Sequence, residues 1–91
     1  MPKFISEREI PAVGSLTGAQ LQGVAQKSCD ALLKVGPEVQ WVQSFVTSDK
    51  TYCVYTASSA DLIVKHAKLS GFPANRVSEV KRIIDDNTAN T

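Results

Sequence analysis

The segment 51–80 constrains the fold more than any other part of the chain, because it predicts a strand, a helix and a second strand in direct succession. Residues 51–56 are mostly β-branched or aromatic, which is typical of a strand. A helix follows and stops at Gly71, with Pro73 two residues on, since a glycine cap followed by a proline is a common helix end. Residues 76–84 carry spaced valines and isoleucines and predict the second strand.

An earlier helix has clear signals at both ends. Thr17 and Gln20 fit a capping box, in which the threonine oxygen and the glutamine side chain satisfy free N–H groups of the first turn. Apolar residues then recur at helical spacing as far as Val35. Gly36 and Pro37 follow, and we expect the helix to end there.

Shorter signals place the remaining elements. Ser58 and Asp61 have the spacing of a second capping box, so the later helix is expected to begin there and to run to Ser70. Residues 3–10 contain apolar and charged side chains without glycine, and residues 39–46 alternate in polarity. Both segments predict strands.

The predicted order of elements is strand, helix, strand, strand, helix, strand, which is the split βαβ pattern of an α+β ferredoxin-like fold, a βαββαβ sandwich. Residues 39–46 and 51–56 form an antiparallel hairpin around the turn at 47–50. With right-handed crossovers, the antiparallel sheet should have the order 4-1-3-2, with both helices on one face. We expect residues 1–91 to make a single domain, with a polar, frayed tail over 85–91.

Apolar side chains on both faces of the predicted sheet suggest that both faces are covered. A two-layer domain that stands alone has strands with one apolar and one polar face. The strand 39–46 instead places Trp41 and Phe45 on one face and Val42 and Val46 on the other. In a chain this short, the expected cover is a second copy. We therefore predict a homodimer of the dimeric α+β barrel type, joined through the open sheet face.

Composition argues against several classes of protein. Ten basic and nine acidic residues, with no long run of either sign, lack the basic stripe of a nucleic-acid-binding protein. No segment approaches the roughly 20 apolar residues of a membrane helix, and the N-terminus lacks the apolar stretch of a signal peptide. Cys29 and Cys53 make no framework of disulfide bridges. These observations predict a cytoplasmic, reduced protein without a nucleic-acid or membrane partner.

The candidate site centres on His66, the only histidine. It lies at the border of the apolar face of the later helix, where it is either a core side chain with one hydrogen bond or a functional group. Neutral imidazole is a common ligand of divalent metals and titrates near neutrality. His66 is therefore a candidate metal ligand or acid/base group.

Glu7 and Glu79 come from strands that should be neighbours. Ionised carboxylates are costly to bury unless they are paired or bound to a metal. One interpretation is that both form salt bridges; the available partners are Arg8, Arg76, Lys81 and Arg82. The other is that Glu7, Glu79 and His66 converge between the sheet and the later helix. Such a set could hold a divalent metal or transfer protons.

Cys53 and Tyr55 alternate along one strand and should face the same side. A buried cysteine is most often a small apolar residue, whereas a thiolate beside His66 would strengthen a site for nickel, zinc or copper. Trp41 and Tyr55 are expected either in the core or an interface, or as walls of an apolar ligand pocket.

Four stretches of the sequence carry a family resemblance. They are KFISEREIP (3–11), QWVQSFV (40–46), YCVY (52–55) and GFPANRVSEV (71–80). Together they resemble a small bacterial family, long described as a domain of unknown function, whose members are often labelled nickel-binding. The resemblance covers nearly the whole chain and implies a dimeric ferredoxin-like fold that binds nickel. It supplies no ligand motif, so the metal candidates rest on the chemistry above; they are His66, Glu7, Glu79 and Cys53.

Two main functions follow. The first is a non-enzymatic, dimeric protein that binds nickel or another divalent transition metal, although copper would bind at least as tightly. The second is an isomerase or monooxygenase that holds an apolar small molecule, or haem, between sheet and helices. Trp41 and Tyr55 would form its walls, and His66 and Glu79 its acid/base groups, or His66 would be the axial ligand of haem. A plain interaction dimer is the third alternative, because the fold alone does not decide function.

Overall fold

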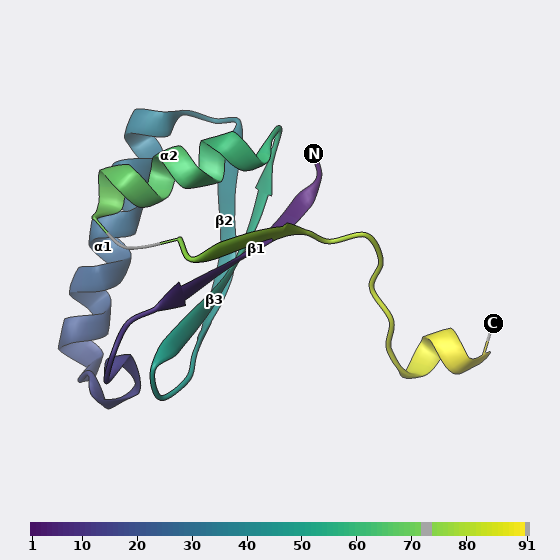
Figure 1. Cartoon of the computed structure of the whole chain (residues 1–91), viewed down its shortest axis with the longest axis horizontal. Coiled ribbons are helices and arrows are strands. Elements are labelled where there is room, and N and C mark those ends of the chain that lie inside the picture. The colour runs from purple at the N-terminus through teal and green to yellow at the C-terminus, as the bar shows by residue number, and fades with distance from the viewer. Residues whose placement is uncertain (72–73, 91) are drawn as a thin grey trace.

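The computed structural model describes residues 1–71 and 74–90 (Figure 1). The elements follow in the order β1 (Lys3–Glu9), the 3-10 helix η1 (Val13–Ser15), α1 (Gly18–Val35), β2 (Val39–Val46), β3 (Lys50–Ala57), α2 (Ala60–Ser70), β4 (Arg76–Glu79) and the 3-10 helix η2 (Asp86–Asn90). The strands form one antiparallel sheet in the order β2-β3-β1-β4. This is the predicted order 4-1-3-2 read from the opposite edge, and it confirms the α+β ferredoxin-like fold.

The helices cover one face of the sheet and leave the other open (Figure 1). Every second residue of β1 and β3 is buried, because successive side chains of a strand point to opposite faces. The core lies between the helices and this face; its buried cluster comprises Phe4, Val39, Cys53, Tyr55, Ala57 and Ile63. Among the described residues, neither helix is long and apolar enough to cross a membrane.

The capping box of α1 is confirmed. The backbone N–H of Thr17 donates to Oε1 of Gln20 over 2.9 Å, and the N–H of Gln20 donates to Oγ1 of Thr17 over 3.2 Å. Gly36 ends the helix with a φ of 103°, a backbone conformation that favours glycine. The first helix therefore begins and ends where the sequence predicts.

The capping box predicted for α2 is wrong. Its N-cap residue is Ser59, which makes no capping hydrogen bond through its side chain. The hydroxyl of Ser58 donates instead to Oε2 of Glu38, over 3.4 Å. The predicted stop is correct, since Gly71 caps α2 in the left-handed conformation. Pro73, expected to follow this stop, lies outside the described residues.

A β-bulge in β2 changes which side chains share a face. Trp41 pairs with Tyr55, but the next pair in the register joins Gln43 to Val54, so Val42 has no partner. The extra residue reverses the alternation beyond it. The prediction that Trp41 and Phe45 share a face is therefore wrong: Trp41 faces the helices, and Phe45 lies on the open face.

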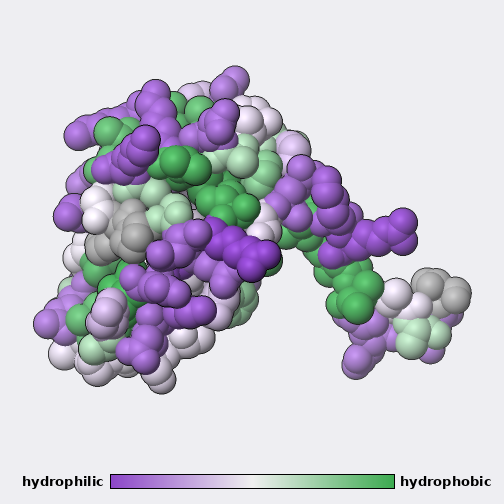
Figure 2. Space-filling view, in the orientation of Figure 1, coloured by the Kyte–Doolittle hydropathy of each residue, from purple (hydrophilic) through white to green (hydrophobic). Residues whose placement is uncertain are grey.

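The last strand is shorter than predicted, because β4 ends at Glu79 rather than at Ile84. The N–H of Val80 donates to the carbonyl of Lys3 over 2.8 Å, and the chain then leaves the body as an extended arm over 81–90 (Figure 1). Ile83 and Ile84 on this arm are 70% and 77% exposed, and Figure 2 shows hydrophobic surface there. Within the expected tail, residues 86–90 form η2.

Candidate functional site

The candidate site is built around Arg8, which lies on the helix-covered face of β1. Phe4, Ser6 and Arg8 alternate with residues of the open face, so the period of the strand carries this arginine into the interior. Its side chain is almost completely enclosed, with 3% of the residue exposed. A guanidinium at this depth is unusual, since a buried charge needs a compensating partner.

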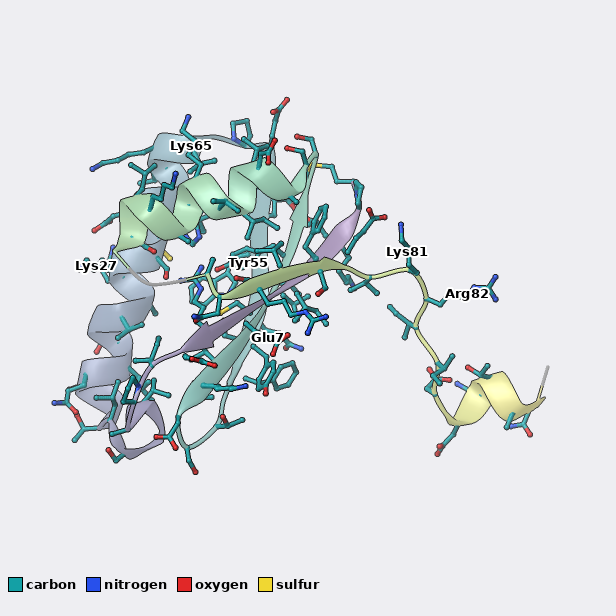
Figure 3. The ribbon with its side chains drawn as sticks, in the orientation of Figure 1. Glu7, Lys27, Tyr55, Lys65, Lys81 and Arg82 are labelled. Atoms are coloured by element: carbon teal, nitrogen blue, oxygen red, sulfur yellow. The ribbon has the colours of Figure 1, made fainter. Side chains whose placement is uncertain are left out.

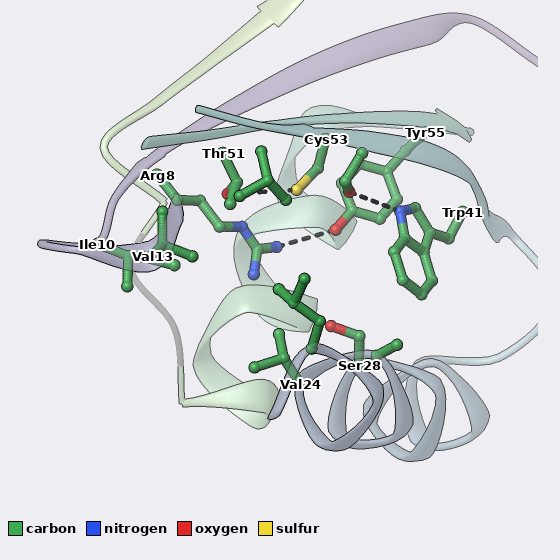
Figure 4. Close-up of a pocket in the computed structure, with 13 residues that line it drawn as sticks. Arg8, Ile10, Val13, Val24, Ser28, Trp41, Thr51, Cys53 and Tyr55 are labelled. Carbon is green, nitrogen blue, oxygen red and sulfur yellow. Dashed lines mark hydrogen bonds between the residues drawn. The ribbon is translucent and has the colours of Figure 1, made fainter. Parts of the chain in front are cut away.

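The partners of Arg8 are two neutral side chains. Its Nη2 donates a hydrogen bond to the hydroxyl of Tyr55 over 3.0 Å (Figure 4) and lies 3.5 Å from Nδ1 of His66. Its Nε has no hydrogen-bond partner. In the described part of the chain Arg8 forms no ion pair; the salt bridge found there joins Lys81 to Glu79. Among the described residues, the partners of this positive charge are therefore neutral dipoles.

His66 is completely buried on α2, and its contacts define its tautomer. Its Nε2 lies 3.1 Å from the carbonyl oxygen of Ser28. A carbonyl only accepts hydrogen bonds and a guanidinium only donates them, so Nε2 carries the proton and Nδ1 presents its lone pair to Arg8. Burial lowers the pKa of His66, and the nearby Arg8 lowers it further, against the opposing effect of the Ser28 hydrogen bond. The imidazole is neutral at pH 7.

Tyr55 completes this group from β3. Its ring meets that of His66 edge to face, with 5.4 Å between the centroids. Burial raises the pKa of Tyr55 above the usual value of a phenol, although the positive charge of Arg8 opposes the shift. The phenol is therefore protonated, and it offers both an acceptor and a donor inside the fold.

An apolar cavity of about 210 Å³ lies between α1 and the sheet, next to Arg8 (Figure 4). Trp41 and Tyr55, the two predicted pocket residues, both line it. The indole N–H of Trp41 donates to Oγ of Ser44 over 2.9 Å, so this aromatic wall has a polar partner at its edge. Arg8 is the one charged residue among the thirteen that line the cavity.

The predicted metal ligands occupy different parts of the structure. Glu7, labelled in Figure 3, lies on the open face of β1, where it pairs with Tyr52 and Arg76, whereas His66 is buried on α2, one of the helices that cover the other face. Glu79 lies at the end of β4, half exposed, and forms an ion pair of 3.2 Å with Lys81. The separation of Glu7 from His66 follows from the alternation of side chains along β1, whereas Glu79 pairs in register with Phe4 of the helix-covered face.

Cys53 lies on the helix-covered face and is buried, as the sequence suggests for a small apolar residue. Its Sγ is 3.6 Å from the hydroxyl of Thr51. Across the described residues, no group of three or more His, Cys, Asp or Glu side chains is placed to hold a metal ion. Glu7, Glu79, His66 and Cys53 thus do not converge within one monomer, and their roles as ligands stay a prediction.

Arg8 is the residue that the sequence analysis missed. From the sequence, its charge marks it only as a salt-bridge partner for Glu7 and Glu79. The signal that identifies it is the alternation Phe4, Ser6, Arg8, since the first of these is a large apolar residue that must face the core.

The open face of the sheet forms a second surface of interest. It has an apolar centre flanked by charged residues; the apolar members are Ile5, Phe45, Tyr52 and Val54. Phe45 is 55% exposed, and Glu7 lies beside Tyr52. A lone two-layer domain would normally place polar side chains at these positions.

Comparisons with known proteins agree with this architecture. Residues 4–80 match a family described as nickel responsive protein, SCO4226-like. The chain belongs to this SCO4226-like family. The crystal structure of SCO4226 from Streptomyces coelicolor A3(2) has a TM-score of 0.75 to this chain, with 19% sequence identity over 90% of this chain and 99% of that one. At this identity the likeness shows the shared fold. A comparison with curated proteins gives no match.

Proposed function

We propose that this protein is a non-enzymatic nickel-binding protein that acts as a homodimer in the cytoplasm. The observation that carries the proposal is the match of residues 4–80 to a family described as nickel responsive. A protein that responds to a metal ion must distinguish its presence from its absence, and direct binding is the simplest way to do so. The free state of both cysteines accords with a reducing compartment.

The metal site is proposed to lie on the open face and to need two copies of the chain. His66 is a poor ligand where it lies, because Nε2 carries a proton and the lone pair of Nδ1 faces the cationic Arg8. Glu7 offers carboxylate oxygens on the open face. In a twofold dimer joined through this face, Glu7 of both copies would enter one interface. Two carboxylates brought together there need cationic partners; Arg76, the register neighbour of Glu7, is one, and nickel would provide another.

Two features of the surface support the homodimer. The open face exposes apolar side chains, among them Phe45, in a domain whose other face is already filled by two helices. The arm over 81–90 exposes Ile83 and Ile84 without packing them on its own body. Burying apolar area is a main driving force of protein–protein association. A second copy would cover both surfaces at once.

Native mass spectrometry of tag-free protein, with and without nickel, tests this function. We expect a dimer that takes up stoichiometric nickel, a Glu7→Gln variant that loses the metal, and a His66→Gln variant that keeps it. Glu38→Gln, outside the open face, is the matched control. Loss of nickel uptake in the His66→Gln variant alone would place the metal at α2 and overturn the open-face site. A protein that takes up no nickel would overturn the proposed function.

A second function is favoured by one observation, the cavity lined by Trp41 and Tyr55. It agrees with the alternative of a small-molecule pocket of the isomerase or monooxygenase type. Haem does not suit this cavity, because a volume of about 210 Å³ is below the range of roughly 300–1,000 Å³ usual for drug-sized ligands. Both nitrogens of His66, the expected axial ligand, are also engaged within the fold. The pocket suits a smaller molecule.

A further inference from the structure

We propose that the cavity beside Arg8 binds a small apolar carboxylic acid as its anion, with the carboxylate paired to the buried guanidinium. The ligand class is a single-ring aromatic acid or a short aliphatic acid. This inference rests on the pocket function given above as the second candidate, and it does not depend on nickel binding.

The first argument is the uncompensated charge. Arg8 is 3% exposed and cannot lose its proton inside a protein. Its contacts, the Tyr55 hydroxyl and Nδ1 of His66, are both neutral. A buried charge without a counter-ion is strongly destabilising, so such groups are normally paired. A ligand that brings one negative charge would complete this site.

The second argument is the donor geometry. The guanidinium has five N–H groups; among the described residues its Nε is fully buried without a partner, so the donors that a ligand can reach are those of the two terminal nitrogens, of which Nη2 already donates to Tyr55. Carboxylates match this planar fork with two parallel hydrogen bonds. Tyr55 lines the same cavity and keeps its phenolic proton, so it can donate a further hydrogen bond to a carboxylate held by Arg8. A doubly charged phosphate would find only one cation here.

The third argument is the size and character of the cavity. A dry cavity of about 150 Å³ is enough to hold benzene. The cavity of about 210 Å³ therefore has room for one ring, or a short chain, together with a carboxylate. Away from Arg8 its walls are largely apolar; they include Ile10, Val13, Leu21, Val24 and Val46. The body of the ligand must therefore be apolar.

The cavity reaches the surface beside the hairpin of β2 and β3. Val46 lines the cavity and is 44% exposed, and together with Leu21 it also borders a shallow hollow at the tip of the hairpin. A ligand that enters at this point meets apolar walls first and reaches Arg8 with its anionic end. The charged group is then shielded from water, which strengthens its pairing with the guanidinium.

Calorimetric titration of the tag-free protein with benzoate and hexanoate, in the presence of a chelator, tests the inference. Hexanamide and inorganic phosphate serve as probes that lack, respectively, the charge and the apolar body. We expect saturable binding of at least one acid and no binding of hexanamide or phosphate. Equal binding of hexanoate and hexanamide would overturn the role of the charge but leave the pocket function standing. No binding of any apolar probe would overturn both.

Variants locate the binding site. Arg8→Gln should weaken binding of the acid at least tenfold, whereas Arg76→Gln, on the other face of the sheet, should leave it unchanged. Because removing Arg8 perturbs the core, Val24→Phe provides a second variant that fills the cavity and keeps the arginine. Folded Val24→Phe protein that binds the acid with unchanged affinity would overturn the inference. Binding of the acid that is seen without chelator and lost in its presence would also overturn the inference, because the acid would then be held by a metal.

Discussion

The unprotonated Nδ1 of His66 lies 3.5 Å from Nη2 of Arg8, so the only histidine of the chain faces a permanent cation. The opposite ring nitrogen is held by the carbonyl of Ser28. A proton on Nδ1 would place two positive charges side by side in a buried space. The pair therefore makes the folded state sensitive to acid.

Acidification is expected to destabilise the protein through His66. In the unfolded chain its pKa is about 6.5, whereas burial and Arg8 lower it in the folded state. Below pH 6.5 the unfolded chain therefore binds the proton first, and the free energy of unfolding should fall by up to about 1.4 kcal/mol per pH unit until the folded pKa is reached. Urea unfolding across this range measures the slope. His66→Gln should lose it; an identical slope in that variant would contradict the prediction.

The hydrogen bond between Arg8 and Tyr55 should contribute measurably to stability. Tyr55→Phe removes the acceptor of a buried charged donor, which should lower the free energy of unfolding by about 1–3 kcal/mol. Tyr52→Phe, three residues earlier in β3 and on the partly exposed open face, is the matched control and should change it by less than about 0.5 kcal/mol. Chemical denaturation measures the free energy of unfolding of both variants. An equal decrease in the two would show that the hydrogen bond from Arg8 to the phenol does not stabilise the fold.

Gly14 is required by the contact between η1 and the hairpin. A Cβ at this position would lie 2.6 Å from the carbonyl oxygen of Thr47 and 2.8 Å from Cα of Ser48, both backbone atoms. Gly14→Ala should therefore destabilise the fold by about 1–3 kcal/mol. Gly23→Ala, within α1 where nothing lies near, should stabilise it by about 0.8–1 kcal/mol. Thermal unfolding of both variants is the measurement; a stabilised Gly14→Ala protein would contradict the packing described for η1.

The proposed dimer predicts different effects at three exposed apolar residues. Phe45→Glu on the open face and Ile84→Glu on the arm should each weaken association at least tenfold, because a charge would enter the interface. Leu33→Glu is the control, since Leu33 is 83% exposed on α1, away from both surfaces. Light scattering over a range of concentrations measures the mass. A monomer mass for the unaltered protein at every concentration would disprove the dimer.

Much of the fold is predictable because its signals are local. The pair Thr17 and Gln20 sets the start of α1 through hydrogen bonds three residues apart. The alternation along β3 correctly places Cys53 and Tyr55 on one face. These features depend on neighbouring residues alone, and a single sequence contains them.

The errors arise where tertiary contacts decide between local alternatives. Val42 forms a bulge without the glycine or proline that would mark one, so the faces of β2 could not be assigned beyond it. Ile83 and Ile84 have the pattern of a strand but pair with no strand in the described part of the chain. The burial of Arg8 is not predictable from the sequence for the same reason, because it depends on contacts with Tyr55 and His66, which are distant in the sequence.

Because of the bulge at Val42, the side chains that line the cavity are determined by the number of residues in β2 as well as by their types. Trp41 lies before the bulge, and Ser44 and Val46 lie after it, yet all three line the same cavity. Deleting Val42 would remove the bulge and leave the pairs Trp41–Tyr55 and Gln43–Val54 consecutive, so that Ser44 and Val46 would keep their face. A one-residue insertion between Gln43 and Ser44 that no bulge absorbs would instead exchange several side chains between ligand pocket and outer surface in a single mutational event. In this fold, binding preference can diverge by insertion or deletion while the strand itself is retained.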